Sequence, residues 1–223
     1  MPRRDCQMPD VIVSNWAFLA QGLAITVQLS ALTILAGTLL GLALGVARFL
    51  RVPVIGQIAV FYIEFVRGTP LLVVLFICYF GLPALLHFHT TAYRAALLGF
   101  VLFIGAYIAE EIRVGLRSVS AGLIQAGLAM GLTPSQVLRF VVLPLAFRRV
   151  IPSLFNQYVR LFKFTSVASV IGVDEFTASA LLVNARVFSP VTIILTVAAT
   201  YLVLCSAISF AGRALYAHLA VRT

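Results

Sequence analysis

Three polar residues stand at helical spacing inside an apolar segment: Asn156, Arg160 and Lys163, four and three positions apart. Residues at this spacing share one face of a helix, and Ser153 and Ser166 extend that face by one step at each end. Inside a membrane, each cation would cost about 3 kcal/mol if it faced lipid, so such residues normally face a partner or a water-filled path. A cation there can hold a carboxylate where no bulk water competes. A buried ion pair, or a side chain that reaches toward the interface, remains the alternative.

Charged residues also pair up in two other apolar segments. Glu64 and Arg67 lie three positions apart on one helix face, where they either line the same path or form a buried ion pair. Glu110, Arg113 and Arg117 share a face near the end of the next segment, which is typical of salt bridges at the membrane interface. The residues predicted to face a substrate pathway are therefore Glu64, Arg67, Asn156, Arg160, Lys163 and Ser166.

The residue patterns for catalysis and for nucleotide binding are missing from the sequence. It contains no Gly-x-x-x-x-Gly-Lys-Ser/Thr phosphate loop, and no nucleophile is arranged with a base. His87 and His89 could contact a metal ion, but without a third ligand nearby a solvated loop is the better interpretation. We therefore predict no catalytic residue, no metal site and no cofactor in this chain.

Membrane helices are the elements that must position these side chains. Hydrophobic residues make up 62% of the 223 and charged residues 10%, whereas a soluble domain carries about a quarter charged. Three stretches, 11–47, 68–93 and 187–212, contain no Asp, Glu, Lys or Arg, and each exceeds the ~20 residues that cross the hydrocarbon. Backbone polar groups in lipid must be satisfied internally, which predicts an all-α integral membrane protein surrounded by the lipid bilayer. The net charge of +9 then reflects orientation signals at membrane borders rather than nucleic-acid binding.

About five transmembrane helices are expected, over roughly 15–47, 56–82, 92–114, 150–172 and 189–211. Five spans place the termini on opposite sides. Nine basic residues would share one side: Arg48, Arg51, Arg113, Arg117, Arg139, Arg148, Arg149, Arg213 and Arg222. Four would lie on the other: Arg3, Arg4, Arg94 and Arg186. The positive-inside rule therefore predicts a periplasmic segment over 1–14, a transmembrane domain over 15–215 with a cytoplasmic loop over 118–149, and a cytoplasmic tail over 216–223.

Glycine recurs every four residues on the first helix, at Gly37, Gly41 and Gly45. Such a face lets another helix approach closely. It predicts packing either within this chain or against a second membrane subunit.

The cytoplasmic loop is predicted to form a helix-turn-helix. A first helix runs from Ser118 to Met130, and Gly131 suits the left-handed position just past its end. Thr133 is a good N-cap, Pro134 follows at the first helical position, and a Gln three residues after Thr133 completes a capping box. A second short helix would end at Pro144. The glycines of the loop leave little side chain, so a partner surface could sit near the backbone.

The same loop resembles the coupling loop of ABC importer permeases, which has a Glu-Ala-Ala start, Gly six positions on and an aliphatic-x-Leu-Pro close. The matching positions here are Gln125, Ala126, Gly127, Gly131, Val141, Leu143 and Pro144. Three other segments resemble motifs of permeases for polar amino acids: residues 65–72, residues 105–115 with Gly-Ala-Tyr-Ile-Ala-Glu, and residues 152–167 with Lys-Phe-Thr-Ser-Val. The chain is thus similar to the permease subunit of a type I ABC importer, in the histidine/glutamine permease group.

Three positions depart from that pattern. The family usually has Glu where Gln125 stands, Ala where Gly127 stands and Asp where Phe164 stands. Loss of the acid at Gln125 could retune docking to the ATPase, and Phe164 affects the expected substrate range more than the fold.

The resemblance implies half of an alternating-access pathway in the bacterial inner membrane, carrying a polar or charged amino acid. ATP would be bound by separate ATP-binding cassette subunits that dock on the coupling loop, at Gln125, Ala126, Gly127, Gly131, Leu143 and Pro144. A second permease subunit, the same or related, and a periplasmic substrate-binding protein would complete the importer. The alternatives are a stand-alone secondary transporter or channel, which predicts internal repeats that are not found, and a membrane anchor, which needs no polar fourth span.

Overall fold

A computed structural model describes residues 8–50 and 53–219, and all regular structure in these ranges is helical. Three helices are long and apolar enough to cross a membrane: α2 (Trp16–Phe49), α6 (Ala92–Arg117) and α11 (Pro190–Leu219). Two bent pairs bring the number to five if each pair is one span. This agrees with the predicted count, and the spans expected at 15–47, 92–114 and 189–211 match the three long helices.

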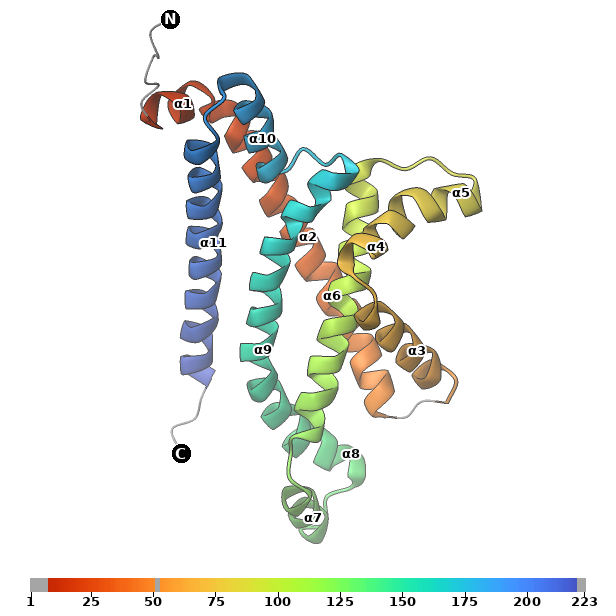
Figure 1. Cartoon of the computed structure of the whole chain (residues 1–223). Coiled ribbons are helices and arrows are strands. Elements are labelled where there is room, and N and C mark those ends of the chain that lie inside the picture. The colour runs from red at the N-terminus through yellow and green to blue at the C-terminus, as the bar shows by residue number, and fades with distance from the viewer. Residues whose placement is uncertain (1–7, 51–52, 220–223) are drawn as a thin grey trace, which may run out of the picture.

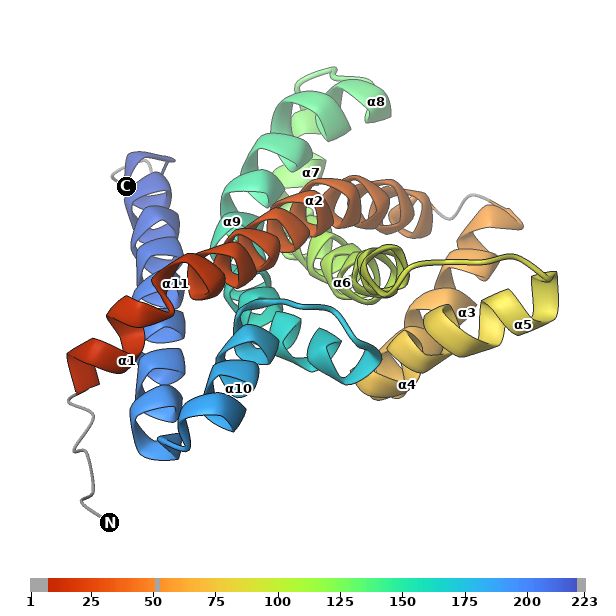
Figure 2. The ribbon, with the colours of Figure 1, turned by 90° about the horizontal axis from the view of Figure 1, so that it is seen from above.

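The long helices pack around α6 (Figure 1). α2 crosses it along most of its length, and α9 (Leu143–Phe164) lies against its other side. α11 packs on α9 at the margin of the molecule, far from α5 (Leu82–Leu86) at the opposite margin (Figure 2). The short helix α1 (Met8–Ser14) and the end of α11 lie at opposite ends of the molecule (Figure 1). Residues 1–7 of the predicted N-terminal segment 1–14, and residues 220–223 of the predicted tail 216–223, lie outside the described residues.

The second span is not the continuous helix predicted over 56–82. α3 (Ile55–Gly68) and the helical run over 71–86 meet at an angle of 113°. Pro70 lacks a backbone N–H and disfavours a helical conformation at Thr69, which is extended at φ −103° and ψ 135°. The Thr69 hydroxyl donates to the Phe65 carbonyl at 2.8 Å, so one backbone acceptor freed by the break is satisfied. Beyond the bend, α4 (Leu71–Phe76), a π-helical turn (Ile77–Gly81) and α5 form one arm.

The fourth span begins earlier than expected, because Pro144 does not end the preceding helix. α8 (Pro134–Val137), a π-helical turn (Leu138–Val142) and α9 follow without a break. The wider turn lets the Leu143 N–H bond to the Leu138 carbonyl, and it brings Pro144 into the first turn of α9, where no N–H is required. The predicted stop at Pro144 is therefore wrong.

At its other end the fourth span bends by 55° into α10 (Phe176–Val187). The end expected for this span at residue 172 is confirmed: a 3₁₀ turn (Thr165–Ile171) ends at Gly172, which is left-handed at φ +86°. Glu175 then caps α10 from a fully buried position, accepting the N–H groups of Thr177 at 2.9 Å and Ala178 at 2.8 Å. Tyr201 of α11 donates to the same carboxylate at 2.9 Å, so the bend is fastened to the last helix.

The glycine face of α2 packs against α6 of the same chain. A Cβ added at Gly41 would lie 2.6 Å from the Ile108 side chain and 2.9 Å from the Gly105 carbonyl oxygen. A Cβ added at Gly45 would lie 2.7 Å from the carbonyl oxygen of Ala109. Packing within this subunit, the first of the two interpretations of the glycine repeat, is therefore what the structure shows.

We expect Gly41→Leu to destabilise the subunit by about 1–3 kcal/mol, the usual cost of overpacking a filled contact. The obstructing atoms include α6 backbone, which cannot move without separating the two helices. The matched control is Gly122→Leu, because a Cβ there meets nothing within 4 Å. The yield of monodisperse subunit in mild detergent should fall for the first variant and hold for the second. Equal yields would contradict close packing of α2 on α6.

Candidate functional site

The polar residues of α9 lie on a side of the helix that the rest of the chain leaves open. Asn156, Arg160 and Lys163 are all exposed. The other sides of α9 contact neighbouring helices: Gln157 donates to Glu111 of α6 at 2.9 Å, and the hydroxyls of Tyr158 and Thr38 of α2 lie 2.9 Å apart. Ser166 belongs to the 3₁₀ turn above α9 and is half-buried, with its hydroxyl donating to the Lys163 carbonyl at 2.7 Å.

Arg67 and Arg160 meet at one aromatic ring that sequence reasoning did not single out. The guanidinium carbon of Arg67 lies 5.7 Å from the centre of the Tyr107 ring, and that of Arg160 lies 5.4 Å from it. Cations at these distances are attracted to the face of an aromatic ring. Tyr107 lies inside the Gly-Ala-Tyr-Ile-Ala-Glu segment, so the sequence pointed to it. That segment does not show that two arginines from different helices contact the Tyr107 ring.

Asn156 lies beside α11 instead. It lines a cavity of about 250 Å³ between α9 and α11, together with Ser209, Arg213 and Tyr216. The structure therefore brings Arg67 and Arg160 together and places Asn156 beside α11.

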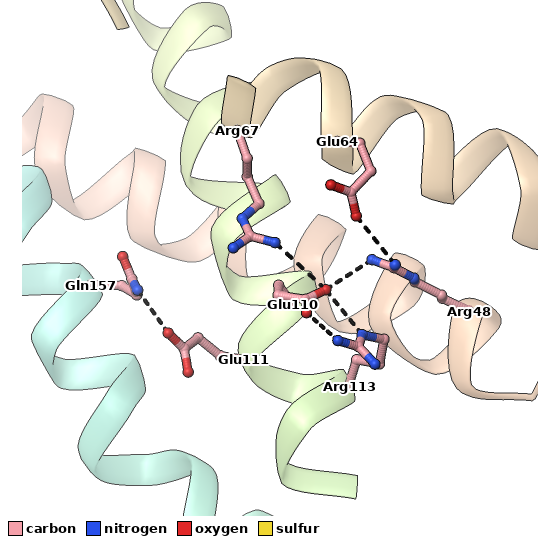
Figure 3. Close-up of polar contacts among 7 residues, drawn as sticks. All are labelled: Arg48, Glu64, Arg67, Glu110, Glu111, Arg113 and Gln157. Carbon is pink, nitrogen blue, oxygen red and sulfur yellow. Dashed lines mark hydrogen bonds and ion pairs between the residues drawn. The ribbon is translucent and has the colours of Figure 1, made fainter. Parts of the chain in front are cut away.

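Glu110 is the centre of a charge cluster that joins α2, α3 and α6 (Figure 3). Its Oε2 atom accepts from Arg48 Nη1 at 2.8 Å and from Arg113 Nε at 3.0 Å, and Arg113 Nη2 bonds to Oε1. Arg67 Nη1 lies 3.8 Å from Oε2. Glu64 is 60% exposed and pairs with Arg48 at 3.3 Å, so Glu64 and Arg67 belong to one cluster without being each other's partner.

This cluster settles two sequence interpretations. The salt bridge expected between Glu110 and Arg113 is present, but Arg117 is exposed and forms no ion pair with the described residues. A direct Glu64–Arg67 pair, offered as an alternative, does not form in that part of the chain either. The contribution of Arg48 could not be predicted from spacing, because it comes from another helix.

The loop over 118–149 forms the helix-turn-helix that its sequence predicts. α7 (Ala121–Ala129) ends in a left-handed Gly131 at φ +85°, and the Leu132 N–H returns to the Gly127 carbonyl at 3.2 Å, as in a Schellman motif. The capping box is complete: the Thr133 N–H donates to Gln136 Oε1 at 2.8 Å, and the Gln136 N–H donates back to Thr133 Oγ1 at 3.4 Å. The first helix starts at Ala121 rather than at 118.

The helix pair projects from the end of the molecule opposite α1 (Figure 1). Among the residues predicted to contact a partner, five are exposed: Gln125, Ala126, Gly131, Leu143 and Pro144. Gly127 is buried instead, since a Cβ there would lie 3.1 Å from the Val137 side chain. The expectation that Gly127 keeps the outer surface open is therefore wrong, because Gly127 lets α7 and α8 approach each other.

A groove of about 260 Å³ runs between the end of α2 and the helix pair. Its walls are apolar: Phe49, Ile124, Leu128, Pro134, Val137, Leu138 and Val142. A helical membrane subunit with a broken span, an exposed cationic face and a projecting helix pair at one end has the architecture of the transmembrane half of an ABC importer.

The chain belongs to the family described as "Binding-protein-dependent transport system inner membrane component", whose model matches residues 37–223. The glutamine transport system permease protein GlnP of Escherichia coli (strain K12) is 37% identical over 198 residues, which cover 88% of this chain and 90% of that protein. The arginine transport system permease protein ArtQ of Bacillus subtilis (strain 168) is 31% identical over 197 residues, with the same coverage of 88% and 90%.

Solved structures of ABC transporters also superpose on this chain. A chain from the crystal structure of an amino acid ABC transporter with histidines superposes with a TM-score of 0.87 at 28% identity, covering 93% of this chain and 96% of that one. The MetNI methionine ABC transporter in an inward-facing conformation gives a TM-score of 0.76 at 19% identity, over 92% and 98% of the two chains, and shows the shared fold.

The predicted family, all-helical fold and role are therefore confirmed. The chain is a permease subunit in the group of amino acid ABC permeases, and it is a multi-pass membrane protein of a bacterial ABC importer. It acts in a complex with ATPase subunits, and these bind and hydrolyse ATP. Family membership overturns the alternatives of a stand-alone secondary transporter, a channel or a simple membrane anchor.

Proposed function

We propose that this subunit forms half of an alternating-access pathway for a polar or charged amino acid, with the exposed face of α9 lining the path. The observation that carries the proposal is the position of Arg160 and Lys163, exposed in the last two turns of α9 without an ion pair among the described residues. Facing lipid would cost about 3 kcal/mol for each cation, so water, substrate or another subunit must cover them. The relatives named for glutamine and arginine transport support an amino acid as substrate.

A second permease subunit, the same or related, completes the path in this proposal. The open side of α9 is bordered by α6 and α11, and no other helix in the described part of the chain covers it. The ATPase docks on the α7–α8 pair, which projects from the end of the molecule (Figure 1). Gln125, Ala126 and Gly131 of this pair are exposed. A periplasmic binding protein delivers the substrate at the opposite end, in keeping with the family description.

The pathway hypothesis predicts water access along α9. Arg160→Cys and Lys163→Cys should react with a membrane-impermeant thiol reagent in the assembled importer, and an added amino acid substrate should change the rate. Leu161→Cys is the matched control, since Leu161 lies between them and is fully buried. The chain also contains Cys6, which is replaced by Ser in every variant, whereas the native Cys78 and Cys205 are buried and should contribute little background.

Lys163→Met extends the test to function. We expect this variant to lower substrate-driven transport more than it lowers folded yield, because it removes a charge without removing the packing stem. If positions 160 and 163 stay unreactive and Lys163→Met loses stability alone, the cations are structural contacts and the path lies elsewhere.

We also propose a periplasmic N-terminus and a cytoplasmic C-terminus. The nine-to-four distribution of basic residues supports this orientation, and so does the position of α1 at the end opposite to α7, α8 and the end of α11 (Figure 1). A fluorescent protein fused after Thr223 should fold in the cytoplasm and fluoresce. An epitope placed before residue 1 should bind antibody in cells whose outer membrane has been opened. Detection of both ends on one side would break the five-span arrangement.

A further inference from the structure

The open face of α9 carries more positive charge than this chain neutralises. Arg160 and Lys163 form none of the ion pairs found among the described residues. The residue that follows Lys163 is Phe164, whose ring packs edge-on against Phe103 at 5.9 Å, so no carboxylate emerges beside the ammonium group.

Arg67 adds to this charge from α3. Among the described residues, its one acidic neighbour within ion-pair distance is Glu110, at 3.8 Å, and that carboxylate is already bonded to both Arg48 and Arg113 at 3.0 Å or less. Arg67 is 35% exposed and lies against Tyr107, where Arg160 also lies. Two guanidinium groups are therefore gathered at one ring, and neither has a carboxylate of its own.

The acidic residues near the face are fewer than the cations. The Glu110 cluster holds three arginines and two glutamates and so retains one net positive charge. Glu111 is the other carboxylate on this side of α6, and its Oε1 accepts from Gln157 at 2.9 Å. When Arg160, Lys163 and Glu111 are counted with the cluster, two net positive charges remain.

An ordinary amino acid brings one carboxylate and one ammonium group, so it would place a cation beside cations already present. An amino acid with a second carboxylate carries a net negative charge, so its attraction to these cations exceeds the repulsion of its ammonium group. Guanidinium groups bind carboxylates through paired, charge-assisted hydrogen bonds, and these interactions strengthen where bulk water is excluded.

We propose that this half of the pathway selects an amino acid with a second carboxylate, the dicarboxylic class, and that Arg67, Arg160 and Lys163 contact its carboxylates. The inference rests on the proposed function, since it requires that the face of α9 lines the path. It goes further by giving the sign of the substrate's net charge, which is negative.

The test compares L-glutamate with L-glutamine, which differ in little besides one charge. The complete importer, with its ATPase, second permease subunit and binding protein, is reconstituted in proteoliposomes, and ATP-driven uptake is measured for both and for L-aspartate and L-arginine. L-Glutamate should reach half-saturation at a concentration about tenfold or more below that of L-glutamine, the scale of one charge-assisted hydrogen bond. L-Aspartate should behave as L-glutamate does, and L-arginine should not be transported.

Variants then assign the preference to this face. Arg160→Gln and Lys163→Gln should each raise the half-saturating concentration of L-glutamate by about tenfold, and that of L-glutamine by clearly less, so that the preference for L-glutamate narrows. Arg94→Gln is the control, because Arg94 is an exposed cation in the first turn of α6, away from the face. The comparison in the unmodified importer needs no variant, so it stands even where a substitution prevents folding.

Three results would overturn the inference. Preference for L-glutamine or L-arginine would do so while leaving the importer function intact. A dicarboxylate preference that both Gln variants retain would place selectivity outside this face. No uptake of any amino acid would reject the proposed function together with the inference.

Discussion

Replacing Glu110 by Gln is expected to destabilise the folded subunit by about 3–5 kcal/mol, the range for removing one partner from a largely buried ion pair. The Glu110 side chain is 16% exposed, and Arg48 and Arg113 are each 17% exposed. The substitution leaves guanidinium groups from α2, α3 and α6 close together without the carboxylate that they share (Figure 3). Repulsion between three helices should then weaken the whole bundle.

Glu64→Gln is the matched control for this prediction. Glu64 belongs to the same cluster, but it is 60% exposed and makes one ion pair at 3.3 Å. An exposed pair of this kind contributes about 0–1 kcal/mol. Thermal unfolding in mild detergent, followed by size-exclusion chromatography, should show a large loss for Glu110→Gln and a small one for Glu64→Gln. Similar losses would mean that Glu110 does not hold the helices together.

The three long spans and the α7–α8 turn could be predicted because each depends on local physics. A bilayer of constant thickness demands about 20 apolar residues, so charge-free stretches reveal α2 and α11 directly. The capping box at Thr133 and the left-handed Gly131 depend on neighbours within a few residues. Such features are present in the chain before any tertiary contact forms.

The breaks in the helices were harder to predict. Pro70 signals a break, but its 113° angle depends on how α3 and α4 pack against α6. Pro144 signals a stop that does not occur, because a π-helical turn absorbs the missing N–H. Proline thus marks where a helix can bend or end, and the surrounding structure decides whether it does.

The candidate site could be predicted only in part, because helical spacing is a local property and contacts between separate helices are not. Spacing placed Arg160 and Lys163 on one face of a helix, and both are exposed on α9. It could not show that Arg67 and Arg160 meet at Tyr107, or that Gln157 bonds to Glu111, since these contacts join separate helices.

Gly131→Arg is expected to abolish most ATP-driven transport while the subunit still reaches the membrane. Gly131 has φ +85°, a conformation that costs a residue with a Cβ about 1–2 kcal/mol. It is exposed at the turn between α7 and α8, and a Cβ there would meet nothing within 4 Å, so this chain has room for the new side chain. A docked ATPase would leave no room for that side chain if it contacts the turn as we propose.

Two smaller substitutions separate strain from obstruction. Gly131→Ala adds the cost of the left-handed conformation with little bulk, and Gly131→Asn adds modest bulk to a residue that tolerates this conformation. If obstruction of the ATPase is the cause, both should keep most of the uptake, and Gly131→Arg alone should lose substrate-stimulated ATP hydrolysis. If strain in the turn is the cause, Gly131→Ala should already fail and Gly131→Asn should be better than Gly131→Ala. Normal uptake by Gly131→Arg would remove the α7–α8 turn from the docking surface, because a long cation at its tip could not then lie against a partner.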